Sequence, residues 1–484
     1  MNPYTIIVII GVYFGLLLII SSITSRGANN QSFFLGNRQS PWYIVAIGMI
    51  GASLSGATFI SVPGEVINSH FYYLQMVLGY ILGYIVIAFV LLPVYYKLQL
   101  TSIYTYLGLR FGNISYKTGS SLFLISRLIG ASLRLLLVAK VLQIVVFEKL
   151  GVPFYATVII TLILIWVYTF KGGIKTIVWT DTLQTIFMIL AVVLTFIFLA
   201  GSMDLSLRNA VQAIGVSGYS DIFDFSGWQS GTYFWKHFLS GMFITIVMTG
   251  LDQDMMQKNL SCRNLRDAQK NMLTYSFAFI PVNLVFLAVG ALLYIFALQN
   301  SIQFPNDTDD IFAMIATGGY LPAVVSIFFI LGLIAAAYSS ADSALTSLTT
   351  SFLVDILGVE NNSEDQIKAK RIVVHLMMSG ILALLILIFK AKSNENVITN
   401  LFKFAGYTYG PLLGLYSFGL FTTRKIKELP VPAIAVSSSV IVYIISQNSE
   451  AWLGGYKMGF EALIYNGLLT FTGLFLVSKR KRTR

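Results

Sequence analysis

The sequence of 484 residues has very little cysteine, histidine or charge: one Cys, three His, and 11% charged residues. A single cysteine, Cys262, excludes an intramolecular disulfide, and no second Cys or nearby His completes a metal site with it. The three histidines are scattered, and their spacing suggests neither a zinc site nor a Ser/His/Asp triad. Because no nucleophile and base pattern or redox motif is present, we do not expect an enzyme.

What the chain has instead is apolar residues, which make up 56% of it and give a mean hydropathy of +0.77. This composition lies far outside that of soluble globular domains. Apolar runs of about 20 residues, the length a helix needs to cross a bilayer, recur along the whole chain. They predict an all-α polytopic membrane protein in one domain, with about thirteen spans near residues 4–22, 42–67, 71–96, 118–147, 154–169, 177–201, 235–251, 271–299, 318–354, 372–389, 398–421, 430–447 and 459–478.

The net charge of +11 is a topology signal rather than a nucleic-acid signal. Of the 32 Lys and Arg, 22 fall in one alternating set of loops, which includes the tail KRKRTR. Basic loops face the cytoplasm, so we expect a cytoplasmic C-terminus and an outside N-terminus in a cell (inner) membrane. The first span lacks a basic leader and a clear cleavage site, so it is interpreted as a helix. The expected partners are the lipid bilayer and a small-molecule substrate, with neither nucleic acid nor an obligate protein partner.

The second span, AIGMIGASLSGATFISVPGEV, is a poor continuous helix, because glycine weakens helices and proline removes a backbone donor. Unwound backbone is tolerated in a membrane only where it lines a cavity or binds something. Freed carbonyls are good ligands for a hard cation. The alternative is that the small residues only allow helices to pack closely; the residues concerned are Gly48, Gly51, Gly56, Pro63 and Gly64.

The ninth span, LIAAAYSSADSALTSLTTSFLVDI, is rich in hydroxyl groups and contains an acid. Spacings of three and four residues put Ser339, Asp342 and Ser343 on one helix face. Such oxygens suit a sodium ion, although Ser and Thr also hydrogen-bond between membrane helices. Asp181, one turn into the sixth span, is either a second acid at this site or an interfacial residue.

Four motifs give the chain a resemblance to the sodium/solute symporter family, the family of sodium/glucose-type cotransporters, and within it to the bacterial sialic acid symporters. They are GGIKTIVWTDTLQ, AAAYSSADSALTS, LSGATFISVP and DQDMMQKNLSCRNLRDAQK, the last similar to a cytoplasmic loop of the family. The resemblance implies a LeuT-type fold, in which two five-helix repeats of opposite topology hold the site near the bilayer midplane. The repeats would span residues 42–201 and 235–421, with an extra N-terminal helix at 4–22 and two C-terminal helices at 430–478.

The resemblance also implies residue roles. The principal sodium site would use backbone carbonyls and hydroxyls of Gly51, Leu54, Ala336, Ser339 and Ser340. A second sodium site would use Asp181, Asp342 and Ser343 together with Ser339, so that one or two sodium ions couple to transport. The solute would contact Ser53, Ser55, Thr58, Tyr73 at a gate position, and Arg127, whose planar guanidinium matches a carboxylate.

The chain departs from the sialic acid branch at three places. Asp342 stands where that branch has serine, and it could serve the second ion site, bind a proton, or pair with a base such as Arg134. The second departure is Arg134, which has no counterpart in the family. It lies seven residues after Arg127, on nearly the same helix face. The branch's glutamine in the third span is Val77 here, with Gln75 nearby.

The function expected from these features is sodium-coupled symport of a small polar solute by alternating access. The resemblance favours a carboxylated sugar such as sialic acid. One alternative is a sodium-coupled symporter of a neutral sugar, polyol or nucleoside, with Arg127 in a structural pair. A second is a membrane sensor that binds solute without moving it, although no soluble signalling domain is apparent.

Overall fold

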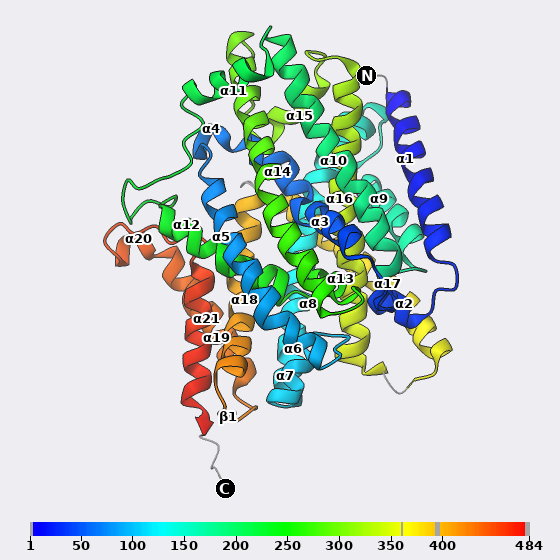
Figure 1. Cartoon of the computed structure of the whole chain (residues 1–484), viewed down its shortest axis with the longest axis vertical. Helices are drawn as coiled ribbons and strands as arrows, with labels where there is room; N and C mark the ends of the chain where they lie inside the picture. Colours follow the sequence, from blue (N-terminus) through cyan, green and yellow to red (C-terminus); the bar gives the residue numbers. More distant parts are fainter. Residues whose placement is uncertain (1–2, 360–361, 393–396, 480–484) are drawn as a thin grey trace.

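The computed structural model describes residues 3–359, 362–392 and 397–479, and it is almost entirely helical (Figure 1). The first half contains α1 (Pro3–Thr24), α2 (Asn30–Leu35), α3 (Trp42–Gly64), α4 (Val66–Ser69), α5 (Tyr73–Val86), α6 (Leu92–Lys97), α7 (Thr105–Arg110), α8 (Asn113–Leu142), α9 (Phe154–Thr169), α10 (Ile174–Ser202) and α11 (Leu207–Val216). The second half contains α12 (Phe234–Thr245), α13 (Gln253–Leu260), α14 (Leu265–Gln299), α15 (Ile311–Thr317), α16 (Ala323–Ser351), α17 (Glu364–Lys392), α18 (Val397–Phe421), α19 (Val431–Gln447), α20 (Ser449–Trp452) and α21 (Ala462–Leu476).

Short elements join these helices. Wider helical turns continue α5, α8, α12 and α16 at η2 (Ile87–Leu91), η3 (Gln143–Phe147), η5 (Ile246–Gly250) and η7 (Phe352–Leu357). Tighter turns form η1 (Gly36–Arg38), η4 (Glu148–Leu150) and η6 (Thr308–Asp310). Strands β1 (Lys425–Ile426) and β2 (Ser478–Lys479) pair antiparallel after α18 and α21.

Within the described residues, seven helices are long and apolar enough to cross a membrane, or up to nine if each of two bent pairs is one span. Three shorter apolar helices, α9, α19 and α21, accompany them. The polytopic helical architecture is therefore confirmed. The count of thirteen spans stays a prediction.

The first helix of each predicted repeat is broken. In α3 the segments Trp42–Gly56 and Thr58–Gly64 are bent by 58°, and Ser55, just before the bend, has non-helical angles, φ 39° and ψ 166°. In the second repeat Phe234–Gly250 and Gln253–Leu260 are bent by 65°. The break predicted in the second span is present. Its non-helical residue is Ser55, and Pro63 lies inside the second segment. The repeat boundaries themselves stay a prediction.

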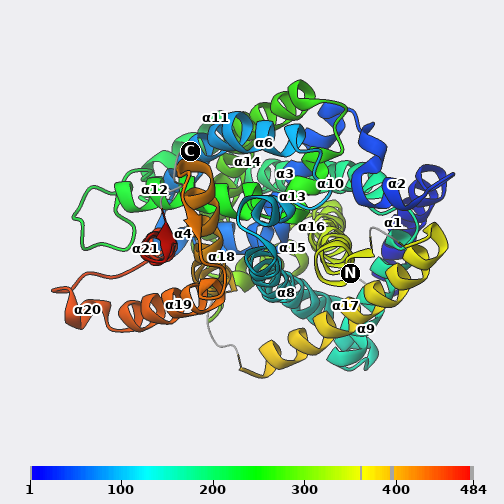
Figure 2. The same ribbon diagram turned by 90° about the horizontal axis from the view of Figure 1, so that it is seen from below.

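The helices α3, α8, α10, α14 and α16 pack against one another in the middle of the molecule, as the view from below shows (Figure 2). Glycine allows the closest approaches. A Cβ at Gly51 would collide with the Thr185 side chain of α10, and one at Gly56 with Val138 of α8. The small residues of α3 therefore allow close packing, and the helix is also interrupted; binding of a cation by the interrupted backbone stays a prediction.

Several of the loops that the sequence assigns to opposite sides of a membrane lie at opposite ends of the molecule, while α20 lies at mid-height (Figure 1). The lower end carries α7 and β1, which belong to the basic loops, and the upper end carries α4, α11 and α15. The start of α1 is at the upper end and the end of α21 at the lower.

Packing of α5 on α12 supplies a test of the fold. A Cβ at Gly79 would collide with the Phe238 carbonyl, and one at Gly241 with the Met76 carbonyl. Because backbone cannot move aside, we expect Gly79→Leu to destabilise the protein by about 3 kcal/mol, measured as a lower Tm in detergent. Gly15→Leu, on α1 where nothing lies within 4 Å, is the matched control. Equal Tm values for the two variants would contradict this packing.

Candidate cation and solute site

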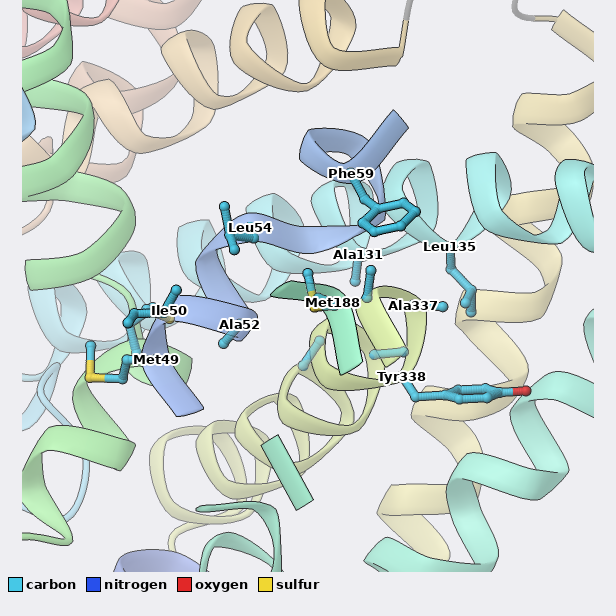
Figure 3. Close-up of a cluster of buried hydrophobic side chains, with 14 of the residues drawn as sticks. Met49, Ile50, Ala52, Leu54, Phe59, Ala131, Leu135, Met188, Ala337 and Tyr338 are labelled. Atoms are coloured by element: carbon cyan, nitrogen blue, oxygen red, sulfur yellow. The ribbon is translucent and has the colours of Figure 1, made fainter. Parts of the chain in front are cut away.

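The break in α3 interrupts the helical backbone at the centre of the bundle. Figure 3 shows the α3 ribbon running extended between Leu54 and Phe59, with Ala337 and Tyr338 of α16 in the same close-up. Leu54 and Ser55 are buried, and α3 packs on α16. Interrupted helices inside membrane transporters present carbonyl groups of this kind to sodium ions.

Two serines of α16 add hydroxyl groups to this region. Ser339 Oγ donates to the Ala336 carbonyl over 3.3 Å, while the buried Ser340 Oγ has no hydrogen-bond partner among the described residues. A buried hydroxyl without a partner is uncommon in native proteins and calls for a ligand or a water. The five predicted ligands of the principal sodium site thus lie on two packed helices, and their donor groups fit a sodium ion. Their roles as ligands stay predictions.

The predicted second sodium site contains a basic residue as well as its acids. Asp181 on α10 and Asp342 on α16 are fully buried, and the Ser343 hydroxyl lies beside Asp181. Lys258 on α13 places its Nζ 2.7 Å from Asp181 Oδ2, and its side chain is 2% exposed. Asp342 accepts from the Tyr168 hydroxyl at 2.9 Å and from the Ser343 backbone N–H at 2.5 Å. Asp181 is therefore not an interfacial acid.

Sequence reasoning missed Lys258, because the polar stretch DQDMMQKNL was interpreted as part of a cytoplasmic loop. That expectation was wrong for residues 253–260, which form α13 with every residue buried. The local signal was present. Asp252 caps the helix, accepting from the backbone N–H groups of Asp254 and Met255, and an Asp just before a helix is a typical start signal.

The residues predicted to bind solute surround one cavity of about 80 Å³. Ser53, Ser55 and Thr58 come from the broken α3, Tyr73 from α5 and Arg127 from α8. Pockets that hold small ligands usually measure roughly 300–1,000 Å³, so a sugar-sized solute requires the lining side chains to move apart. The sequence thus identified a shared cavity, while the binding roles of its residues stay predictions.

Arg127 and Arg134 both line this cavity but have different partners. Arg127 donates to the Asp254 carboxylate and lies 3.9 Å from Asp252. Arg134 makes no ion pair within the described part of the chain, with Asp342 or any other acid, and its Nε has no hydrogen-bond partner there. Arg127 is charge-paired inside the protein, whereas Arg134 lines the cavity with no ion pair among the described residues and only a longer-range interaction with Asp252.

Tyr73 lines both this cavity and a larger one of about 340 Å³. The larger cavity is lined by the second segment of α3, by α5, by the segment before α12 and by α18. Gln75 does not reach the small cavity. Its amide donates to the Thr232 carbonyl at 3.0 Å and accepts from the Asp224 backbone N–H at 3.1 Å. Gln75 therefore does not take the place of the glutamine that the sialic acid branch has at the position of Val77.

Asp224 holds the segment before α12 in place outside the spans. It accepts from the hydroxyls of Ser226, Ser230 and Thr232. Partial burial raises the pKa of Asp224, but the hydrogen bonds from these groups outweigh it and lower the pKa to about 2. Asp224 therefore stays ionised, and able to accept these hydrogen bonds, at every physiological pH.

This arrangement, a bundle of apolar helices with a broken span, buried hydroxyl groups beside it and a polar cavity, defines a multi-pass membrane transporter. A model of the sodium:solute symporter family matches residues 33–428. The chain belongs to this family.

Curated relatives and solved structures agree with this assignment. The chain is 25% identical to the sodium/sialic acid symporter NanT of Aliivibrio fischeri, over 96% of this chain and 90% of NanT. It is 25% identical to the sodium/sialic acid symporter SiaT of Proteus mirabilis, over 89% of this chain and 87% of SiaT. It is 23% identical to the human sodium/iodide cotransporter, over 85% of this chain and 65% of that protein.

The solved structure of a substrate-bound, outward-open Na⁺-coupled sialic acid symporter matches with a TM-score of 0.82 at 20% identity, over 99% of both chains. A nucleobase-cation-symport-1 family transporter matches with a TM-score of 0.55 at 16% identity, over 92% of this chain and 94% of that one. These likenesses confirm the predicted LeuT-type fold.

The Arg127–Asp254 pair supplies a test of the site. Removing one member of a buried ion pair leaves the other charge unpaired and costs about 3 to 5 kcal/mol, whereas replacing both is nearly neutral. We expect Arg127→Met to lower the Tm strongly and Arg127→Met with Asp254→Asn to restore most of the loss. A double variant no more stable than the single one would show that the two residues do not depend on each other.

Proposed function

We propose that the protein imports a small organic anion, a carboxylated sugar of the sialic acid type, together with sodium. The observation that carries this proposal is Arg134, an unpaired guanidinium facing a cavity lined by hydroxyl groups. A buried unpaired charge is costly. A carboxylate in the cavity would compensate it through two parallel hydrogen bonds.

The rest of the cavity suits a polyhydroxylated solute. Ser53, Ser55 and Thr58 offer both donors and acceptors to sugar hydroxyls, and Tyr73 offers an aromatic face. The sialic acid symporters among the relatives support the same substrate class. Arg127 lies in the same lining, where its ion pair with Asp254 orients the cavity wall.

Sodium would couple to the solute through the broken helix. An ion held by the carbonyls of Gly51, Leu54 and Ala336 and the hydroxyls of Ser339 and Ser340 joins α3 to α16. Since Ser53 and Ser55 of the same broken segment line the solute cavity, the ion fixes solute contacts. Each ligand then raises the affinity of the other by the same factor.

The access route follows from the two cavities. The protein lies in the cell (inner) membrane with its N-terminus outside and its C-terminus in the cytoplasm. In this orientation the larger cavity is the external vestibule. Movement of the Tyr73 side chain would connect it to the smaller cavity and enlarge that site. Inward movement of sodium gains about 2.3 kcal/mol per charge per 100 mV of membrane potential.

A neutral sugar, polyol or nucleoside is the second candidate, and two observations favour it. Val77 stands in place of a glutamine, and Arg127 is already paired with Asp254. In that case Arg134 would hydrogen-bond a neutral oxygen. Competition separates the candidates, because carboxylated sugars would inhibit uptake under the first proposal and neutral sugars under the second.

Uptake of radiolabelled N-acetylneuraminic acid into proteoliposomes tests the proposal. We expect uptake that requires an inward sodium gradient and ceases when choline replaces sodium. Arg134→Ala should lower kcat/KM for the anion at least a hundredfold, the loss expected for a charge-assisted bond of about 3 kcal/mol, with Arg134→Lys retaining part of the activity. Full uptake by Arg134→Ala would disprove the role of Arg134, and undiminished uptake in choline would disprove sodium coupling.

A further inference from the structure

The cluster around Lys258 disagrees with a second sodium ion at the position predicted for it. Three helices meet there, α10 with Asp181, α13 with Lys258 and α16 with Asp342. The Lys258 ammonium is 2.7 Å from Asp181 Oδ2, and both Asp181 and Lys258 interact electrostatically with Asp342. An ammonium therefore already lies against one of the two carboxylate oxygens of Asp181.

A sodium ion bound to the same carboxylate would lie within a few ångströms of this ammonium. Two like charges so close repel strongly where water is excluded. Asp181, Asp342 and Ser343 are fully buried and Lys258 nearly so, so solvent does not screen that repulsion. Asp342 is also held by neutral donors, the Tyr168 hydroxyl and the Ser343 N–H, which orient its carboxylate within the cluster.

The net charge of this cluster also argues against a second sodium ion. With both carboxylates ionised, the two acids and one ammonium would carry a net charge of −1, which one monovalent cation neutralises. The principal sodium site is adjacent, because Ser339 and Ser340 precede Asp342 on α16 and Gly48 of α3 packs directly against Asp181. A single sodium ion there completes the charge balance, and without Lys258 two would be needed.

We propose that Lys258 is a tethered cation that takes the place of a second sodium ion, so that this chain binds one sodium ion per transport cycle. The inference rests on the sodium coupling proposed above and specifies its stoichiometry. Lys258 also fixes Asp181 against α13, so the carboxylate stays positioned when the exchangeable ion leaves.

Equilibrium binding of radioactive sodium to the purified full-length protein tests this without a solute. We expect one ion per chain for the wild type and for Lys258→Arg, which keeps the charge. Lys258→Met should bind two ions, with the Hill coefficient rising toward 2. Adding Asp342→Asn to Lys258→Met removes one carboxylate and should return the count to one.

Each outcome decides something different. Two ions bound to the wild type, or one ion bound to folded Lys258→Met, would overturn the tethered cation and leave sodium symport intact. No specific sodium binding to the wild type would overturn the proposed function itself. Should Lys258→Met fail to fold, Asp342→Asn alone decides, because with Lys258 present it leaves a neutral cluster. Its sodium affinity should fall at least tenfold, and an unchanged affinity would overturn the charge count.

Discussion

The interruption of α3 at Ser55 is the constraint on which the other features of the site depend. A helix in a membrane satisfies its own backbone, so a break there needs partners that lipid cannot provide. In this protein the broken segment is enclosed by α8, α10, α14 and α16. Close packing at Gly51 and Gly56 leaves little space beside it. The broken segment packs on α16 and its side chains line the solute cavity, so under the proposed function one local distortion serves both halves of a coupled site.

Two charged clusters connect this centre to a common element, α13. Asp254 of α13 pairs with Arg127 of α8, on the solute side. Lys258, four residues later on the same helix, pairs with Asp181 of α10, on the ion side. α13 is the second segment of the other broken span. Its charged residues Asp254 and Lys258 therefore form their ion pairs beside the broken helix α3. A movement of α13 would therefore alter the solute cavity and the proposed sodium site at the same time.

Much of this organisation could be predicted from the sequence. Apolar runs revealed the polytopic fold, glycines and hydroxyls marked the broken helix, and motif resemblance placed Ser53, Ser55, Thr58, Tyr73 and Arg127 around one cavity. What remained hidden were the pairings between distant residues. Nothing in the local sequence says that Arg127 is neutralised by Asp254 while Arg134 is not, since that depends on where α13 packs. Polar residues in α13 resemble a loop until their burial is known.

The central claim is that the broken α3 and the α16 serines jointly hold a sodium ion, and thermal stability tests it most directly. The account predicts that sodium chloride, but not choline chloride, raises the Tm of the purified wild-type protein in a saturable manner, because an ion bound only to the folded state stabilises it. In Ser340→Ala, which loses an unpartnered hydroxyl, the half-saturating sodium concentration should rise at least tenfold. A variant that responds to sodium as the wild type does, or a wild type equally stabilised by choline, would contradict the account.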